Sequence, residues 1–444
     1  MGGADLRRIS RGQWLALAAA LLGWMFDGFE QGVIGLVGHP ALVDVLHLQE
    51  PARLAADESQ SETIREEARA RVNKTVGAWL SVINASWLLG AAVGGWLFGW
   101  LGDRLGRVRA MVFSVLAYAL FTGLIGLVHD PWQIVGLRFF AALGMGGEWA
   151  LGVALVMESW PHSLRPVLAG LIGAAANVGF MLNFLPVVLV ESLGMPMSAG
   201  GWRWVLGICA LPAVLTFFLR VFVPESEKWQ QAVRSGPRPR LTEIFTPALR
   251  GRSLLAATVS GIPLIATWGA VAAIVTPWAI SKNGQDWGNY TQTCSGFGAV
   301  LGTISGALLA QLLGRRRTYF LLSLGSLLIC AYLFRWHFQI HPRFDGWFLV
   351  AVGLTGFFTA SFYGWLPLYL PELFSTRVRA TGQGFGYNFG RIIAAGGALY
   401  MSHLLQNVFH GNYPQAGSVI SFIYLAGLVV IWFAPETRGQ PLPE

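Results

Sequence analysis

Ionisable side chains occur inside long apolar segments of this 444-residue chain. They are Asp27, Glu30, Arg138, Glu148 and Arg391. A charged residue in the middle of a membrane helix costs roughly 2.5–3.5 kcal/mol on insertion scales, so such residues usually face the protein interior and have a function there. Carboxylates and guanidinium groups in that position can exchange protons and bind a polar solute, which is the chemistry that this pattern indicates.

The two acidic residues near the N-terminus are expected to meet Arg138. At about 1.5 Å per helical residue, Glu30 and Arg138 each lie about 10 Å from the same end of their segments. Asp27 is one turn deeper than Glu30 and on the same helix face. A carboxylate beside an arginine stays ionised, whereas burial or loss of the arginine favours its proton. We therefore predict that this cluster carries a proton; a permanent structural ion pair is the alternative.

Arg391 is expected to lie near the middle of its segment, about 15 Å deep. Tyr387 and Asn388 precede it by four and three residues, so one helix face presents a guanidinium, a phenol and an amide. Arginine suits bidentate recognition of a carboxylate. We predict a site for an anionic substrate; the alternative is that Arg391 pairs with a carboxylate elsewhere in the bundle. The residues predicted to bind the substrate are Arg391, Asn388, Tyr387, Gln383, Asn177, Trp268 and Tyr363.

The composition places these residues in a membrane protein. Hydrophobic residues make up 54% of the chain and charged residues only 12%, against about 25% charged in soluble domains. The net charge of +8 is expected to reflect cytoplasmic loops rather than nucleic-acid binding. The three cysteines show no disulfide or metal spacing, and no nucleophile elbow or phosphate loop is present. We therefore expect no enzyme activity, no catalytic residue, no metal and no cofactor; a membrane enzyme and a non-transporting sensor are the alternatives.

The apolar segments predict an all-α protein that crosses the bilayer twelve times, since a span needs about 20 mostly apolar residues. The N-terminal segment is interpreted as a first span, not as a signal peptide, because it is long and contains Asp27. The predicted spans are 14–37, 76–100, 110–128, 131–157, 166–190, 204–223, 254–280, 291–313, 318–334, 347–370, 381–405 and 416–434.

The loops predict how the chain is oriented and divided. Most loop arginines fall on the side that holds both termini, which predicts cytoplasmic termini. The outer segment 38–75 contains a stretch, 55–74, that is expected to form a short solvated helix. We predict an N-terminal six-helix bundle over 1–223, a cytoplasmic linker over 224–252 and a C-terminal six-helix bundle over 253–444.

The two predicted halves share short motifs in one order and at a nearly constant offset. Glu158, Arg165 and Gly170 have the same spacing as Glu372, Arg379 and Gly384. The segments 105–109 and 313–317 also match, as do 224–226 and 435–437. A duplicated six-span unit explains all three matches, and parallel repeats of this kind form their substrate site between the halves near the midplane.

Residues 102–107, Gly-Asp-Arg-Leu-Gly-Arg, follow four closely spaced glycines at 90, 94, 95 and 99. This arrangement resembles the loop signature of the major facilitator superfamily. The resemblance implies a charged cytoplasmic latch that stabilises the outward-facing state; loop charge that only sets topology is the alternative. In the second half, no aspartate stands at the position that matches Asp103. The residues assigned to the cytoplasmic gate are Asp103, Arg104, Arg107, Glu158, Arg165, Glu225, Arg315, Glu372, Arg379 and Glu436.

Further segments resemble narrower groups within that superfamily. Residues 22–30, 144–149 and 158–165 are similar to sialate and organic-acid:proton symporters, whereas 224–226 and 435–439 look more like sugar porters. In the related symporters an aspartate and an arginine pair to carry the proton, which corresponds to Asp27 and Arg138 here. The resemblance implies alternating access without a cofactor.

The predicted function is proton-coupled symport of a small organic anion: a sugar acid, an aromatic acid or a monocarboxylate. A sugar:proton symporter and an uncoupled facilitator are the alternatives. The expected partners are this solute, the proton and the lipid bilayer, with no nucleic acid. We expect a monomer in the plasma membrane, here a bacterial inner membrane.

Overall fold

The computed structural model describes residues 9–444, and these contain helices but no strand. The helices before the linker are α2 (Arg11–Val45), α3 (Gln49–Ala56), α4 (Glu62–Leu105), α5 (Arg107–Ile125), α6 (Pro131–Ser159), α7 (Arg165–Leu182), α8 (Leu185–Ser192), η1 (Met197–Ala199) and α9 (Gly201–Val221). The linker contains α10 (Glu227–Ser235) and η2 (Glu243–Phe245).

The second part of the chain has the same kind of architecture, with more interruptions in its helices. Its elements are α11 (Arg250–Ala266), η3 (Thr267–Val275), α12 (Thr276–Asn283), α13 (Gln285–Leu313), α14 (Arg315–Ala331), η4 (Tyr332–Trp336), α15 (His337–Ile340), α16 (Gly346–Ala360), α17 (Phe362–Leu373), α18 (Arg379–His403), η5 (Leu404–Val408), α19 (Tyr413–Ser421), α20 (Ile423–Val430) and η6 (Ile431–Phe433). The elements η3, η4 and η5 are π-helical.

Ten helical segments in the described chain are long and apolar enough to cross a membrane. The α2 segment also qualifies when it is taken together with α3, from which a bend of 115° separates it. The twelfth, α18, is less apolar because its sequence includes Gln383, Asn388 and Arg391. With α2 and α18 the fold has the predicted twelve membrane helices.

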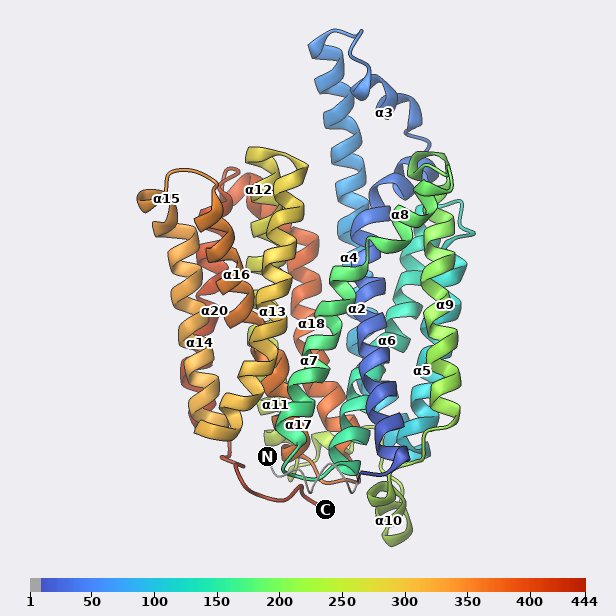
Figure 1. Ribbon diagram of the computed structural model, residues 1–444, viewed down its shortest axis with the longest axis vertical. Helices are drawn as coiled ribbons and strands as arrows, with labels where there is room; N and C mark the ends of the chain where they lie inside the picture. The colour runs from blue at the N-terminus through green and yellow to red at the C-terminus, as the bar shows by residue number, and fades with distance from the viewer. Residues whose placement is uncertain (1–8) are drawn as a thin grey trace.

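The helices form two groups that lie side by side in Figure 1. One contains α2, α4, α5, α6 and α9, and the other contains α13, α14, α16 and α20. The helix α10 marks one end of the molecule, where the C-terminus also lies, and α3 marks the other. These are called the α10 end and the α3 end below. The segment 55–74, expected as a separate short helix, is instead largely continuous with α4, whose first turns project from the α3 end.

Local sequence explains where several of these helices begin and break. The Asp130 side chain caps α6, where Pro131 occupies the first turn, a position that suits its fixed φ. Gly106 separates α4 from α5 with a φ of 114°, and Gly314 separates α13 from α14 with a φ of 92°. Glycine adopts such positive φ values without the steric cost that other residues meet. The repeated glycines therefore allow the same sharp turn in both halves.

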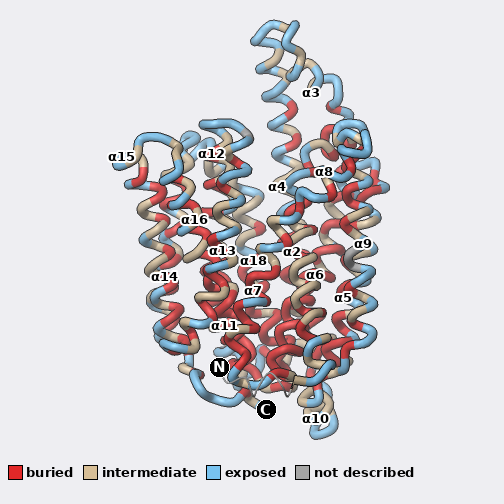
Figure 2. Tube along the Cα trace, viewed as in Figure 1, coloured by how far each residue is buried: buried red, intermediate tan, exposed pale blue. Residues whose placement is uncertain are grey.

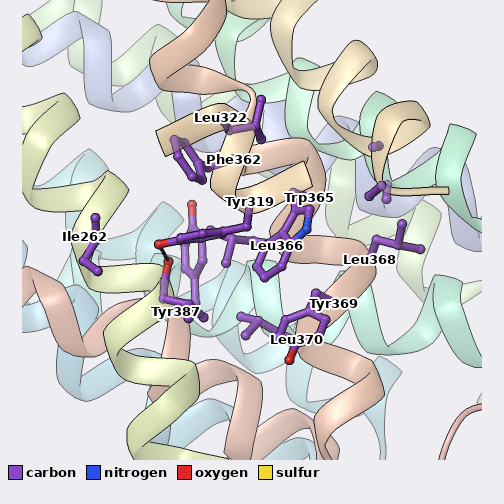
Figure 3. Packing of buried hydrophobic residues seen from close by; sticks show 14 of the residues in the cluster. Ile262, Tyr319, Leu322, Phe362, Trp365, Leu366, Leu368, Tyr369, Leu370 and Tyr387 are labelled. Carbon is purple, nitrogen blue, oxygen red and sulfur yellow. Dashed lines mark hydrogen bonds between the residues drawn. The ribbon is translucent and has the colours of Figure 1, made fainter. Parts of the chain in front are cut away.

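Burial differs between the two ends of the molecule. Figure 2 shows buried residues concentrated toward the α10 end, with more exposed and half-buried positions toward the α3 end. Figure 3 shows part of the core in the second half, where Tyr319 packs against Phe362 and Trp365. The Tyr319 hydroxyl donates to the Val259 carbonyl at 2.9 Å, so this buried phenol stays hydrogen-bonded. Buried side chains are thus concentrated toward the α10 end of the molecule.

Candidate functional site

A cavity of about 320 Å³ lies between the two groups of helices. Its walls include Trp24 of α2, Asn177 of α7, Trp268 of η3, Tyr363 of α17, and Tyr387 and Arg391 of α18. The lining continues along α12 and α13 through Thr276 and Gln292, toward the α3 end in Figure 1. Both halves of the repeat thus contribute to a single cavity, as the duplicated sequence predicts.

The local backbone explains how Trp268 reaches the cavity. It lies in the π-helix η3, which interrupts the segment from α11 to α12 and begins four residues after Pro263. A π-helical turn rotates the following side chains relative to a regular helix and is frequent at functional sites. The sequence indicated Trp268 as a cavity residue, but it gave no sign of the π-helical turn.

Arg391 is the positive group of this cavity. Its side chain is buried, and its Cζ lies 5.0 Å from the ring centroid of Trp87 and 5.8 Å from that of Tyr387. Within the described part of the chain, no carboxylate forms an ion pair with Arg391. A buried charge is expected to be paired, so this arginine can accept an anion from the cavity.

Two residues predicted beside Arg391 point elsewhere. The Gln383 amide donates to the Ala150 carbonyl, and the Asn388 amide donates to the carbonyls of Gly146 and Gly384 at 3.2 and 2.9 Å. Neither residue lines the cavity. The spacing along α18 places Asn388 on the same helix face as Arg391. However, α6 packs closely against α18 there, and the Asn388 amide donates to a backbone carbonyl of α6 instead of facing the cavity.

The cavity ends at an aromatic contact on its α10 side. The Trp149 indole of α6 stacks on the Tyr387 ring of α18, with centroids 3.8 Å apart and an interplanar angle of 13°. Trp24 packs edge-on against the same Tyr387 ring at 6.2 Å. Sequence reasoning identified Tyr387 but not Trp24 or Trp149, because nothing in a single sequence distinguishes these tryptophans from membrane-interface residues.

The acidic cluster of α2 is arranged differently from the prediction. Arg138 forms an ion pair with Glu30, which also accepts a hydrogen bond from Thr122 at 3.3 Å. The expected contact between Asp27 and Arg138 is absent. Glu30 lies at the same depth as Arg138, whereas Asp27 is one turn farther toward the α10 end and has no hydrogen-bond partner among the described residues. Asp27, Glu30 and Arg138 are all buried behind the cavity wall rather than in its lining.

Arg220 is a functional candidate that sequence reasoning missed. This residue of α9 is buried, forms an ion pair with Glu148 of α6, and donates to the Met111 carbonyl at 3.0 Å. Its charge is also close enough to stabilise an ionised Asp27. Arg220 stands near the end of a predicted span, where a basic residue is common. The sequence therefore did not show that its side chain faces the interior of the bundle.

A network of buried charges closes the α10 end. The Asp103 carboxylate of α4 accepts hydrogen bonds from the backbone N–H groups of Ala380 and Thr381 at 3.1 and 2.7 Å. These groups belong to the first turn of α18, where a negative charge is stabilised by the helix dipole. Arg107 bonds to Glu158 at 2.9 Å and to the Thr376 carbonyl at 2.7 Å. Helices of one half therefore bind directly to the other half.

Several other residues assigned to the gate belong to the same network. Arg379 pairs with Glu158 across the two halves at 2.8 Å, and Arg315 forms two bonds to Glu372 at 3.0 and 2.6 Å. Arg165 is buried near Glu158 and Glu372, and it forms no ion pair with any described residue.

Arg104 does not take part in this network. Its side chain is exposed and lies 5.2 Å from the Trp100 ring, because it points away from the α18 side of α4. It is therefore not a gate residue in this conformation.

Glu225 and Glu436 occupy equivalent positions in the repeat. Glu225 accepts from the N–H groups of Arg107 and Val108 at 2.9 and 3.1 Å, and Glu436 accepts from those of Arg315 and Arg316 at the same two distances. Burial raises the pKa of Glu225 above its ordinary value, although these N–H groups oppose the rise. For Glu436, burial also disfavours the charge, but the backbone N–H groups outweigh it and lower the pKa.

The C-terminal segment after η6 also contacts the gate. The Pro443 carbonyl accepts from Arg379 Nη2 at 2.6 Å and from the Thr376 N–H at 3.2 Å, while the Leu442 side chain is buried. This segment therefore lies against the arginine that joins the two halves.

Comparisons with known proteins agree with this architecture. The chain is 30% identical over 369 residues to a probable 4-methylmuconolactone transporter of Cupriavidus pinatubonensis, covering 82% of this chain and 83% of the relative. It is 30% identical over 367 residues to the cis,cis-muconate transport protein of Acinetobacter baylyi, with 80% and 84% covered. The solved structure of the proton:xylose symporter XylE has a TM-score of 0.75 at 16% identity and covers 97% of both chains.

A family profile described as the Major Facilitator Superfamily matches residues 19–398. The profile covers most of both halves, the charged network at the α10 end apart from Glu436, and the cavity lining as far as Arg391. The chain therefore belongs to the Major Facilitator Superfamily, and it is a multi-pass membrane transporter rather than an enzyme.

Proposed function

We propose that this transporter moves a small organic anion together with a proton. The observation that carries the proposal is Arg391, a buried guanidinium in the cavity wall without a carboxylate partner among the described residues. A carboxylate ligand would complete that pair with a bidentate contact. The aromatic side chains around it suit the apolar or ring-shaped body of the same solute.

The proposed substrate class is a sugar acid, an aromatic acid or a monocarboxylate. The relatives named above are described as transporters of muconate and of a muconolactone, and a further relative, 24% identical, is named as the sialic acid transporter NanX of Escherichia coli. These names include organic acids, which is consistent with an arginine in the binding cavity. Among the described lining residues Arg391 is the one basic side chain, which favours a single carboxylate over two.

Proton coupling rests on the buried acids of α2. The carboxyl group of Asp27 lacks a hydrogen-bond donor among the described residues, and burying an unpartnered carboxylate is costly. Asp27 also lies within electrostatic range of both Arg220 and Arg391. An anion bound at Arg391 reduces the positive charge that Asp27 experiences, which favours its protonated form. Substrate and proton would then bind together and cross together.

The α10 end is proposed to face the cytoplasm, because most of the loop arginines lie there. The cavity would then be reached from outside, and the structure would correspond to a carrier closed on its cytoplasmic side. An inward-moving proton gains about 2.3 kcal/mol per 100 mV of membrane potential. We propose a monomer in the plasma membrane, with both termini in the cytoplasm.

Transport by purified protein in lipid vesicles tests the proposal. Benzoate, glucuronate, N-acetylneuraminate and cis,cis-muconate are each compared with their uncharged amides while the external pH is recorded. We expect at least one acid to enter with alkalinisation of the outer solution, and its amide to fail. Equal transport of acid and amide would indicate a sugar-porter type of recognition, and anion uptake without a pH change would indicate an uncoupled facilitator.

The variant Asp27→Asn should lose proton-driven accumulation and keep exchange of labelled for unlabelled substrate. An asparagine retains the shape of the side chain but cannot carry the proton. The control is Glu58→Gln, which removes an exposed carboxylate near the α3 end and should leave both rates unchanged. Accumulation against a gradient by the Asp27→Asn protein would rule Asp27 out as the proton carrier.

A further inference from the structure

Trp87 of α4 lies between positive groups that belong to the two halves. Its indole is 4% exposed. The ring centroid lies 5.9 Å from Arg138 Cζ on α6 and 5.0 Å from Arg391 Cζ on α18. Among the described residues, no other aromatic ring is in this range of both guanidinium groups.

Hydrogen bonding does not account for the position of this side chain. Trp87 Nε1 is buried and has no partner among the described residues, whereas a buried tryptophan N–H usually finds an acceptor. The indole instead packs against the cavity residue Trp268, with ring centroids 5.7 Å apart. A desolvated cation–π contact contributes about 2 kcal/mol or more, so the two arginines are the strongest polar contacts that the ring has.

One ring cannot attract both cations at full strength. The attraction comes from the electron density on the faces of the ring, and a cation that polarises this density toward itself weakens the attraction for a second cation. Neutralising Arg391 therefore strengthens the contact between Trp87 and Arg138. A stronger contact would favour positions of the Arg138 guanidinium nearer the ring and farther from Glu30, with which it forms an ion pair.

We propose that Trp87 transmits binding of the substrate anion at Arg391 to the Glu30–Arg138 ion pair, so that anion binding loosens this pair and lets Glu30 share the carried proton with Asp27, one turn away on α2. This inference rests on the proposed function for its physiological meaning. Trp87 is a positioning residue here, since its own side chain is not part of the cavity lining and cannot carry a proton. Its action makes the two ligands bind cooperatively, which is what symport requires.

Other charged or titratable groups surround the Glu30–Arg138 ion pair and also influence the proton affinity of Glu30. From the helices packed around it these are Asp27 of α2, Tyr118 of α5, Cys209 and Arg220 of α9, and Arg391 of α18. Arg391 also acts on the acids of α2 directly through space. A double-mutant cycle separates that direct effect from the part that needs the indole.

The experiment measures the proton affinity of Glu30 in purified protein without substrate. Infrared difference spectra follow the carboxyl band that disappears in E30Q, as a function of pH. The cycle comprises the wild type, R391Q, W87L and W87L/R391Q, where R391Q imitates neutralisation by the anion. With Trp87 present, R391Q should raise the proton affinity on the order of tenfold, about 1.4 kcal/mol. In the W87L background, the same change should raise it about twofold or less.

W87F provides the conservative variant, because phenylalanine keeps a ring and a smaller cation–π attraction. It should restore part of the R391Q effect, and it also serves if W87L does not fold. Equal R391Q effects in all three backgrounds would overturn the inference, because coupling would then pass through space alone. If wild-type protein in vesicles moved no acid together with a proton, the proposed function would be wrong. The spectroscopic cycle does not depend on that transport result, because it is measured without substrate.

Discussion

At the scale of single residues, the cavity separates side chains that can meet a solute from side chains that hold the helices together. Arg391, Tyr387, Asn177, Trp268 and Tyr363 line it. Their types and spacing within apolar segments were sufficient to indicate them. Gln383 and Asn388 have the same polar character but bind backbone carbonyls of α6, because a sequence does not show how closely a neighbouring helix approaches.

Replacing Arg391 should weaken binding of the anion specifically. A hydrogen bond to a charged group contributes about 1.5–3 kcal/mol, so Arg391→Gln should raise the Kd for the transported acid about tenfold to about a hundredfold. Isothermal titration of purified protein with the acid identified in the transport assay measures this change. Arg391→Lys keeps the charge and should lose less. Unchanged affinity in Arg391→Gln would show that the arginine is not the anchor.

The ion pairs of the first half show a second limit of sequence reasoning. The depth of each residue correctly placed Glu30 at the level of Arg138, but it could not rank Glu30 above Asp27 as the partner. Arg220 escaped notice because its position near a helix end is common for basic residues. Which face of α9 is turned inward is decided by tertiary packing alone.

At the scale of helices, α4 and α18 approach closely near the α10 end. A Cβ atom added to Gly95 would clash with the Asn388 side chain, and one added to Gly99 would clash with the Ala380 carbonyl. The glycine spacing in the sequence predicted close helix packing. It did not reveal that the partner of these glycines is a helix of the other half.

Gly95→Leu should therefore oppose closure of the α10 end. Forcing extra methylene groups into a packed contact costs typically about 1–3 kcal/mol, and here that cost falls on the closed state. Spin labels can be placed at Arg109 and Arg317, two exposed positions at this end. Pulsed electron paramagnetic resonance should then measure a longer mean distance between the labels in Gly95→Leu than in the wild type. The control is Gly77→Leu on the same helix, where a Cβ meets nothing within 4 Å. An unchanged distance distribution in Gly95→Leu would contradict the close contact.

The first turns of α5 and α14 donate hydrogen bonds to equivalent carboxylates, those of Glu225 and Glu436, which respond to pH in opposite ways. The pKa of Glu436 is lowered in the folded protein, so its stabilising effect is present above the ordinary value of 4.5 and is lost as the pH falls. The pKa of Glu225 is raised, so its contribution is greatest at low pH and is lost as the pH rises through the raised value.

Melting temperatures from about pH 4 to about pH 7 test these opposite signs. Glu436→Gln should lose less stability than the wild type on acidification. Glu225→Gln should lose less stability than the wild type as the pH increases. Glu227→Gln removes an exposed acid in the nearby helix α10 and should follow the wild type throughout. The same pH response in all four proteins would show that neither helix terminus depends on the ionisation of its glutamate.

At the scale of the whole molecule, we propose that the network of buried ion pairs at the α10 end decides which end is closed. Truncating one partner of a buried ion pair costs about 3–5 kcal/mol, which is enough to change the balance between two states of similar energy. Arg107→Gln should therefore favour opening at the α10 end and closure at the α3 end. A cysteine introduced at Ser295, in the cavity lining, should then react more slowly with an impermeant maleimide added at the α3 end, in protein lacking the native cysteines.

Arg104→Gln is the matched control for this change. The same loop motif supplies both arginines, but Arg104 is exposed and outside the network. Its variant should label at the wild-type rate. If the two variants behaved alike, loop charge rather than the ion-pair network would control the conformation.

The duplicated halves do not close the α10 end in the same way. Asp103 caps α18 across the interface, but Gln311 stands at the corresponding place in the second half, and its Oε1 has no partner among the described residues. On that side α7 meets α13 and α17 through Gly170 and Gly173, and among the described residues no ion pair joins α7 to either of these helices. When the α10 end opens, we expect the charged contact between Asp103 and α18 to separate first. The contact of α7 with α13 and α17 at Gly170 and Gly173 should then act as the pivot about which the two bundles rotate.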